Sequence, residues 1–420
     1  MKVDPHLVPA FPVQFSDLEC PSCGKGSPVP IGLAVPGSNV LGAYRCDNCG
    51  YRFYRDLPVG FAIDHAIALG MDDGRTFYQG DYVHFTMDPI AKGSRKKNMA
   101  PVQVERRVER RYDRVILLNT LDHLYGHVLL KLWNAQHYLD AHPDLGLVVI
   151  IPKGFEWLVP EGVAEVWSVE LGLSRMLEWH SDLDDTLSGY LKGYEEVYFA
   201  RGYAHPEKDR IDIARFTGIG PFPLHEFQAL PPHITFVMRT DRVWHRWRFE
   251  KWAARSLSLF GSRALRDRIW RIVQDRRMAK CFDRIKKEVP ALTASIVGLG
   301  APGRTYHGME DLRSPNMDVE RERSWCETYA RSHVVIGIHG SNMLLPTAHA
   351  AGCVEILPYD RYRNLGQDLA VRNNDIMQLF LYRFVDEYAS PIQVARHVVS
   401  ILKDHAAYSR NNIKNVFGHE

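Results

Sequence analysis

Short apolar runs alternate with amphipathic stretches along most of the chain after residue 112. In the first half these runs cover residues 115–118, 147–151, 163–169 and 195–200, and residues 125–139 have the pattern of a helix. Short, largely apolar runs are typical of strands that are covered on both faces. Strands that alternate with helices predict a parallel, doubly wound sheet.

A second set of the same kind begins at residue 233. Its predicted strands cover residues 234–238, 293–300, 334–338 and 353–357, and its predicted helices cover 319–330 and 391–405. In the last helix, the apolar face carries Ile392, Ala395, Val399 and Leu402. A proline-rich joint at 218–232 separates the two sets. The pattern therefore predicts two α/β domains with a cleft between them, and ligands in such folds bind beyond the carboxyl ends of the strands.

Residues 333–358, HVVIGIHGSNMLLPTAHAAGCVEILP, form a strand–turn–helix–strand unit. The strand ends in His339 and Gly340, and Ser341 and Asn342 precede a short helix. A glycine at such a junction leaves backbone N–H groups and the positive end of the helix available to a phosphate. We expect Gly340, Ser341 and Asn342 to donate N–H groups there, although an ordinary β–α turn has the same sequence pattern. His339 either hydrogen-bonds the same ligand or caps the strand.

Cysteine spacing predicts a metal site near the amino terminus. Cys20, Cys23, Cys46 and Cys49 form two C-x-x-C pairs that are separated by twenty-two residues. This spacing is that of a tetrahedral, all-cysteine zinc site, which leaves no open position for a catalytic water. We therefore expect a zinc ribbon with a structural Zn²⁺ in residues 1–90. Such a ribbon binds nucleic acid, another protein or its own host domain, and nucleic acid is the less favoured partner here.

Composition and charge narrow the class of protein. The chain has 420 residues, 45% of them hydrophobic, and a net charge of +2, which excludes a protein whose whole surface attracts nucleic acid. No segment has the pattern of a signal peptide, and no apolar run is long enough to cross a bilayer. We therefore expect a cytoplasmic protein, and a location at the inner face of the membrane is the alternative. Residues 91–111 are polar and basic, which predicts a surface linker.

Three segments resemble known glycosyltransferases. Residues 317–358, MDVERERSWCETYARSHVVIGIHGSNMLLPTAHAAGCVEILP, resemble the carboxyl-terminal core of the family sixty-one glycosyltransferases. Residues 234–244, ITFVMRTDRVW, resemble the first strand of that core and, more weakly, a segment of fucosyltransferases. Residues 124–133, LYGHVLLKLW, are similar to a helix of the amino-terminal domain that begins with a histidine.

The resemblance implies a GT-B fold with two Rossmann-like domains and a nucleotide diphosphate-sugar donor. Residues 112–222 are then expected to form the acceptor domain. Residues 223–420 are expected to form the donor domain, with a basic helical insertion at 242–290. The implied reaction is the transfer of a sugar to a hydroxyl of a glycan or lipid-linked acceptor, with inversion.

Arginines are the expected partners of the donor diphosphate. Arg239 ends the strand at 234–238 and can clamp a diphosphate in bidentate fashion, with Arg242 and Arg304 as further candidates. An ion pair between Arg239 and Asp241 is the alternative. A metal held by a D-x-D loop could supply the same positive charge, but the D-x-D at 182–184 follows no convincing strand, so we expect a metal-independent enzyme.

The expected base is His127, near the start of an apolar helix, because inverting transfer needs a group that takes the proton of the acceptor hydroxyl. Asp122 and His123 are nearby alternatives, and a purely structural histidine is the simpler interpretation. Glu355, on an otherwise apolar strand, either accepts hydrogen bonds from a donor hydroxyl or pairs with an internal arginine.

The insertion is strongly basic, with fifteen Lys and Arg against four Asp and Glu between Arg242 and Lys287. It also contains four tryptophans, at positions 244, 247, 252 and 270. Such a hairpin either contacts an anionic membrane or acceptor, or is solvated with its tryptophans packed on the protein body; the sequence slightly favours the second interpretation. Two alternatives to the enzyme remain: a non-catalytic glycan- or partner-binding protein, and a zinc-ribbon nucleic-acid-binding protein.

Overall fold

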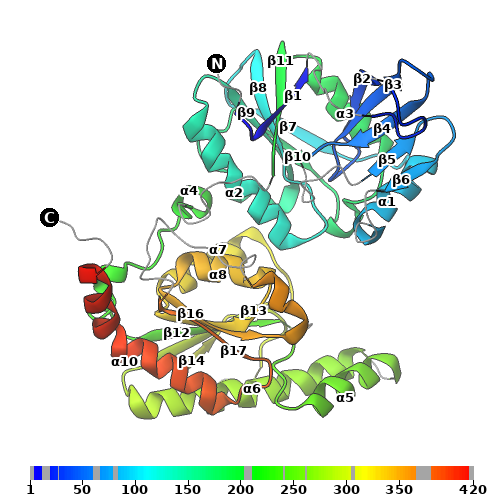
Figure 1. Ribbon diagram of the computed structural model, residues 1–420. Coiled ribbons are helices and arrows are strands. Elements are labelled where there is room, and N and C mark those ends of the chain that lie inside the picture. The colour runs from blue at the N-terminus through cyan, green and yellow to red at the C-terminus, as the bar shows by residue number, and fades with distance from the viewer. Residues whose placement is uncertain are drawn as a thin grey trace. The chain divides into compact units, whose positions relative to one another are not determined.

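The computed structural model describes residues 4–11, 19–26, 28–59, 67–78, 84–202, 211–239, 242–260, 263–303, 308–365 and 380–415. The chain divides into two compact units, Met1–Pro206 and Glu207–Glu420, each with its own sheet and core (Figure 1). No helix among the described residues combines the length and the apolar character that a membrane span requires.

The first unit is built on a six-stranded sheet in the order β1-β11-β8-β9-β10-β7. Its strands are β1 (Leu7–Phe11), β7 (Val104–Val108), β8 (Arg114–Asn119), β9 (Gly146–Pro152), β10 (Glu165–Val169) and β11 (Glu196–Ala200). The four central strands are parallel, and β1 and β7 pair antiparallel at the two edges. The predicted doubly wound sheet is therefore confirmed.

The central strands of this sheet are apolar because both of their faces are covered. Every residue of β9 and β10 is buried. The helix α2 (Tyr125–Ala141) packs on β8 and β9, and α3 (Ser181–Leu191) contributes Leu183 and Leu187 to the core. Strands buried on both faces lose the period-two alternation of polar and apolar residues, which is why they appear as continuous apolar runs in the sequence.

The same unit carries a smaller antiparallel sheet in the order β2-β3-β4-β5-β6. Its elements are β2 (Pro28–Ala34), β3 (Leu41–Cys46), β4 (Arg52–Asp56), β5 (Ile67–Gly70), β6 (Thr76–Tyr78) and the adjoining helix α1 (His84–Arg95). A small core joins α1, through Met87 and Ile90, to Leu41, Leu69 and Trp179. Trp179 belongs to the segment before α3, so this core links the small sheet to the larger domain.

The segment at residues 91–111 is a correction to the sequence interpretation, which predicted a surface linker. Its first residues complete α1, and β7 pairs with β10 at the edge of the first sheet. The strand VERRV exposes four of its five side chains, as edge strands often do, so it shows no apolar period. Arg106 on β7 forms an ion pair with Glu165 (Nε to Oε2, 2.8 Å). Likewise β1 pairs with β11, so this segment within the predicted ribbon module belongs to the first sheet.

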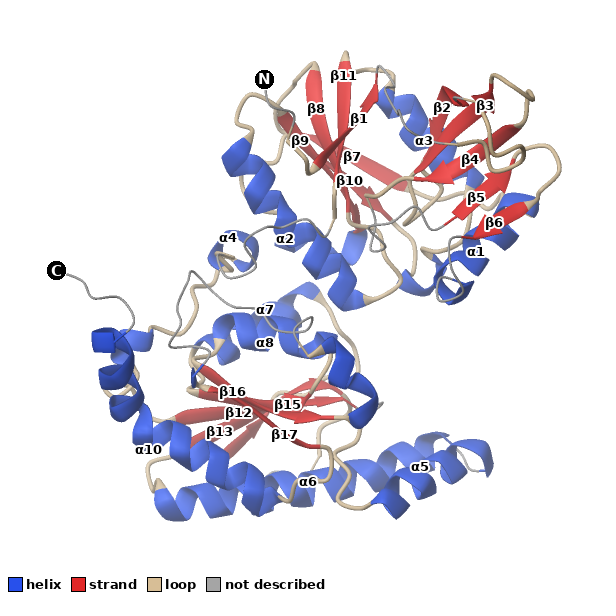
Figure 2. Cartoon of the chain, viewed as in Figure 1, coloured by secondary structure: helices blue, strands red, loops and turns tan. Residues whose placement is uncertain are grey.

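The second unit is a six-stranded, all-parallel sheet in the order β14-β13-β12-β15-β16-β17. The strands are β12 (His233–Arg239), β13 (Thr293–Leu299), β14 (Met309–Asp311), β15 (Val334–Ile338), β16 (Gly352–Leu357) and β17 (Tyr382–Asp386). The helices are α4 (Ala214–Thr217), α5 (Arg248–Phe260), α6 (Arg263–Glu288), α7 (Val319–Ala330), α8 (Leu344–His349) and α10 (Pro391–Asn415). In Figure 2, α6 and α10 cover one face of the sheet, and α7 and α8 cover the other.

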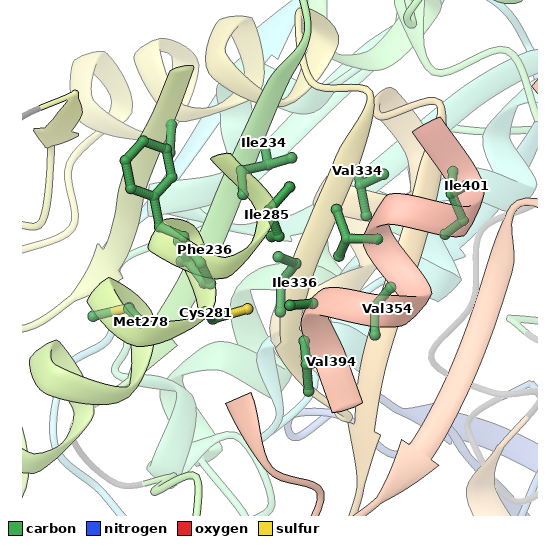
Figure 3. Close-up of a cluster of buried hydrophobic side chains, with 14 of the residues drawn as sticks. Ile234, Phe236, Met278, Cys281, Ile285, Val334, Ile336, Val354, Val394 and Ile401 are labelled. Carbon is green, nitrogen blue, oxygen red and sulfur yellow. The ribbon is translucent and has the colours of Figure 1, made fainter. Parts of the chain in front are cut away.

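Figure 3 shows the core between the sheet and the first pair of helices. Ile234 and Phe236 on β12 and Ile336 on β15 meet Cys281 on α6 and Val394 on α10, and all five side chains are buried. This strand order is that of a Rossmann-like domain. The predicted fold class, two Rossmann-like units with a small amino-terminal cysteine-bearing module, is confirmed.

Candidate functional site

The four predicted cysteine ligands converge at one end of the small sheet. The sulfurs of Cys20, Cys23, Cys46 and Cys49 all lie within 4.8 Å of one another. The Cys20–Cys49 Sγ distance is 3.7 Å and the Cys23–Cys46 distance is 3.8 Å. A tetrahedral Zn²⁺ with Zn–S bonds of about 2.3 Å places its sulfurs about 3.75 Å apart, so the arrangement fits zinc.

The backbone around the cysteines has the geometry of two knuckles. Gly24 N donates to Cys20 O (2.9 Å), and Gly50 N donates to Cys46 O (3.0 Å). Both glycines have positive φ, 63° and 72°, which explains why a glycine follows each C-x-x-C pair. The Asn48 side chain donates to the Cys23 sulfur at 3.6 Å.

The module that carries the cysteines is docked on its own host domain. Ser38 N donates to Met176 O (2.8 Å), and Asn119 Nδ2, at the end of β8, donates to Gly37 O (3.0 Å). A Cβ on Gly37 would lie 2.5 Å from Met176 O, so only glycine allows this approach. Of the three roles expected for the ribbon, the structure supports the contact with the host domain.

The first predicted catalytic group lies where the strand order of the first sheet reverses. β8 is the first strand of the parallel set, and its neighbours β9 and β11 lead away in opposite directions. The chain leaves the carboxyl end of β8 through Asp122 and enters α2, whose first turn carries His127. Such a switch point is the usual ligand site of a doubly wound sheet.

Asp122 is buried there among three nitrogen groups. Its Oδ1 lies 3.1 Å from both His123 Nδ1 and His127 Nδ1, and its Oδ2 lies 2.9 Å from Lys131 Nζ. Lys131 is itself buried and donates to Leu121 O (2.8 Å). Burial alone would raise the pKa of Asp122, but the Lys131 ammonium and the two histidines hold this pKa well below its usual range.

These contacts separate the roles of the two predicted catalytic residues. A carboxylate whose pKa is so low is a poor proton acceptor at neutral pH, whereas it can fix the orientation of the His127 ring through Nδ1. Asp122, His123 and His127 also have the closeness of a metal site. However, a metal ion at this position would need the negative charge of Asp122, and the Lys131 ammonium already neutralises that charge.

The second set of predicted residues meets at the switch point of the second sheet, between β12 and β15. Arg239 ends β12, and His339 and Gly340 follow β15 in the neighbouring position. The Arg242 guanidinium donates to His339 O and lies directly over the Cα of Gly340, where a Cβ would collide with it. Gly340 has a φ of 147°, which L side chains rarely adopt. The structure thus brings Arg242 onto the predicted phosphate turn.

Ser341 and Asn342 open a short 3₁₀ turn, Ser341–Met343, that leads into α8. N–H groups at the start of a helix lack acceptors within the helix. The side-chain oxygen of Asn342 is buried and accepts no hydrogen bond from a described residue, so it can accept one from a ligand hydroxyl.

Glu355 contacts a histidine, a partner that neither of the two expectations named. It is buried on β16, and its Oε2 contacts Nδ1 of His339, which is also buried. Its Oε1 lies 3.8 Å from the sulfur of Cys353. The two buried side chains therefore face each other at the strand ends that carry the turn, and their direct contacts with a ligand stay a prediction.

Arg239 lines a small pocket at the carboxyl ends of β12 and β13. Its wall includes groups that the sequence interpretation did not select: Asp267, Trp270, Arg271 and Gln274 of α6, and Arg313. Trp270 is 7% exposed, and its indole N–H has no hydrogen-bond partner among the described residues. Residues from α6 reach this pocket only through the tertiary fold, because they lie far from Arg239 along the chain.

The sequence analysis also named Arg304 and the D-x-D aspartates as candidates. Arg304 lies outside the described residues, as does Asp241, the expected alternative partner of Arg239. The D-x-D aspartates support the backbone: Asp182 accepts from Val102 N (2.7 Å), and Asp184 accepts from Val35 N (2.7 Å).

No protein family matches the sequence, and no curated protein is similar to it. Among solved structures, E. coli heptosyltransferase WaaC with ADP is 12% identical, with a TM-score of 0.34, over 70% of this chain and 98% of that one. A UDP-N-acetylglucosamine 2-epimerase from Listeria monocytogenes is 9% identical (TM-score 0.28, 70% and 67% covered). An E. coli trehalose-6-phosphate protein bound with UDP-2-fluoro glucose is 12% identical (TM-score 0.23, 73% and 71% covered). At these levels neither the activities nor the ligands of these proteins extend to this chain, and the resemblance to family sixty-one and to fucosyltransferases remains a hypothesis.

Proposed function

We propose that the chain is an inverting, metal-independent glycosyltransferase that moves a sugar from a nucleotide diphosphate-sugar to an acceptor hydroxyl on a glycan or lipid-linked precursor. The observation that carries the proposal is the switch point of the second sheet. There Arg239 ends one strand, and Arg242 reaches the His339–Gly340 turn of the next strand. In this proposal the second unit binds the donor and the first unit binds the acceptor.

The chemistry of the donor explains why two guanidinium groups belong at this position. When the bond between the anomeric carbon and the diphosphate oxygen breaks, the electron pair leaves with the nucleoside diphosphate. Fixed positive charge near the phosphates stabilises that developing negative charge. Arg239, Arg242 and the N–H groups of Gly340 and Ser341 supply it without a metal ion, in positions set by the two neighbouring strands.

The acceptor hydroxyl must lose a proton as its oxygen attacks the anomeric carbon. We assign that proton to His127, whose Nδ1 is held by Asp122 at 3.1 Å and whose ring is partly exposed. Asp122 and Lys131 then act as positioning residues, because the carboxylate is buried and remains charged at neutral pH. The acceptor hydroxyl is then the nucleophile, His127 is the base, and Asp122 orients the base.

The test uses the purified chain with UDP-, GDP-, dTDP- and ADP-sugars, and follows thermal shift and release of nucleotide. We expect one donor to raise the midpoint of unfolding and to be consumed. His127→Ala should reduce turnover by about 10²- to 10⁴-fold while donor binding persists. His137→Ala, on the same helix but away from Asp122, is the matched control and should retain activity.

Three results would count against the proposal. Absence of binding by every donor would remove the donor site. Donor binding without turnover, unchanged in His127→Ala, would favour a non-catalytic binding protein on the same fold. Turnover that is lost on chelation and restored by Mn²⁺ or Zn²⁺ in wild type but not in Asp122→Asn would replace the base with a metal site at Asp122, His123 and His127.

A further inference from the structure

Five exposed aromatic side chains gather in two segments of the second unit. Trp247, Phe249 and Trp252, at the start of α5, are 53%, 66% and 73% exposed, and Tyr359 and Tyr362 are 87% and 68% exposed. We call these five residues the aromatic patch. The chain has nine tryptophans, all within the described residues, and only the two in this patch are exposed. The sequence expectation that the tryptophans of the insertion pack on the body is therefore correct for positions 244 and 270 and wrong for 247 and 252.

The two segments are joined although they lie far apart in the sequence. Lys251 on α5 bonds Glu387 (Nζ to Oε2, 2.9 Å) and lies 4.0 Å from Oδ1 of Asp360. Asp360 belongs to the 3₁₀ helix Tyr359–Asn364. Phe249 and Trp252 are three positions apart on α5, as Tyr359 and Tyr362 are on the 3₁₀ helix, so each pair lies on one face of its helix.

The charged groups around the aromatic patch leave a surplus of positive charge. Of the acidic neighbours, Glu250 pairs with Arg277 (Oε1 to Nη2, 2.5 Å) and Glu387 pairs with Lys251, while Asp360, 69% exposed, lies 4.0 Å from the same lysine. By contrast, the exposed Arg248, Arg361 and Arg363 form no ion pair with any residue that the structure describes. An anionic surface would supply the missing partners.

We propose that the aromatic patch and its arginines bind the surface of an anionic lipid bilayer. Exposed Trp, Phe and Tyr beside Arg are what the interfacial layer of a membrane accepts, because the rings enter the headgroup region while the guanidinium groups meet phosphates. Figure 2 shows α5 and the adjoining end of α6 extending beyond the edge of the sheet. A projecting helix suits a flat bilayer, whereas single-stranded nucleic acid binds in a groove that follows its backbone. The inference does not depend on the proposed enzymatic activity.

The test is co-sedimentation of the full chain with phosphatidylcholine vesicles that contain about 30% phosphatidylglycerol, and with vesicles of phosphatidylcholine alone. We expect binding to the anionic vesicles at about 0.1 M salt that weakens at about 1 M salt. Phe249→Ser with Trp252→Ser should weaken binding about tenfold or more, because both inserted rings are lost. Arg361→Glu with Arg363→Glu should weaken it at least fivefold per arginine.

Matched controls change the same chemistry elsewhere on the surface. Met99→Ser removes an equally exposed apolar side chain (73%), and Arg110→Glu with Arg111→Glu makes the same change of charge at two exposed sites in the first unit. Both controls should bind vesicles like wild type. Absence of binding to anionic vesicles, equal binding by the neutral ones, or equal losses in patch and control variants would each overturn the proposal. Salt-dependent binding of a labelled single-stranded oligonucleotide, without vesicle binding and lost in the Phe249/Trp252 variant, would also overturn it and assign the patch to nucleic acid.

Discussion

Replacing Lys131 with Met tests whether the buried cluster beside the first switch point is organised as described. Lys131 is 1% exposed, and its ammonium contacts Asp122 Oδ2 at 2.9 Å and Leu121 O at 2.8 Å. Met fills a similar volume but leaves a buried carboxylate without its cation. Removing one partner of a buried ion pair costs about 3–5 kcal/mol of the free energy of unfolding. We therefore expect Lys131→Met to destabilise the first unit by that amount at pH 7.

The assay is urea denaturation followed by circular dichroism, together with calorimetry, because the two units need not unfold in one step. Lys153→Met is the matched control: its ion pair with Glu170 (3.2 Å) is 45% and 56% exposed, so its loss should cost less than about 1 kcal/mol. Adding Asp122→Asn to Lys131→Met should restore part of the stability, because the unpaired charge is then removed.

The pH dependence gives the cluster a second, independent readout. The pKa of Asp122 in the folded chain is lowered, so its stabilising contribution is present above its unfolded pKa of about 3.9 and is lost as the pH falls. In Lys131→Met, burial without the ammonium raises the pKa of Asp122, so the variant's carboxylate takes up a proton at a higher pH than the wild-type group. The difference in unfolding free energy between wild type and Lys131→Met should therefore be largest at neutral pH and should narrow as the pH falls toward about 3.9 and below. Equal losses in Lys131→Met and Lys153→Met, with no such narrowing, would refute the reasoning.

Three further changes test other parts of the chain. Gly340→Ala, which combines a φ of 147° with a collision against the Arg242 guanidinium, should lower the free energy of unfolding by about 1–3 kcal/mol and weaken donor nucleotide binding in calorimetric titration; unchanged values would contradict this geometry. Elemental analysis of wild type should find one Zn²⁺ per chain. Cys46→Ser should lose this zinc, whereas Cys281→Ser, which changes a buried cysteine outside the cluster, should retain it. Equal zinc contents in the two variants would exclude the cysteine site. Burial raises the pKa of Asp56 to about 7, although Asn39 Nδ2 donates to its Oδ1 at 3.1 Å, so the free energy of unfolding should fall as the pH rises from about 4 to 7. Asp56→Asn, which does not titrate, should show a smaller fall in urea denaturation at about pH 5 and pH 8; an equal fall in variant and wild type would contradict this.

Much of the fold could be predicted because its signals are local. The strands at 115–118, 147–151 and 334–338 are buried on both faces, so each appears as an apolar run wherever the rest of the chain lies. The edge strand β7 was missed for the opposite reason: one neighbour and solvent exposure let it keep charged side chains. β1 belongs to the first sheet only because it pairs with β11, nearly two hundred residues later in the chain. No local sequence pattern encodes that pairing.

The candidate sites divide in the same way. His127 and Asp122 could be selected from the sequence because they lie close together along the chain, and Lys131 follows His127 by one helical turn, so a buried lysine on an apolar helix was an available signal. Nothing local signals that Arg242 bonds the carbonyl of His339, that Glu355 faces His339, or that α6 lines the pocket at Arg239.

The sequence by itself determined the buried strands, the doubly wound class and the four positions of the cysteine cluster, since apolar periodicity and fixed cysteine spacing act over a few residues. Only the tertiary structure decided the partners: the strand order places two strand ends at each switch point, and packing brings Lys131 to Asp122 and His339 to Glu355. The physical reason is that a buried ion must be compensated within a few ångströms in space, and the chain can supply the compensating group from any distance along its length.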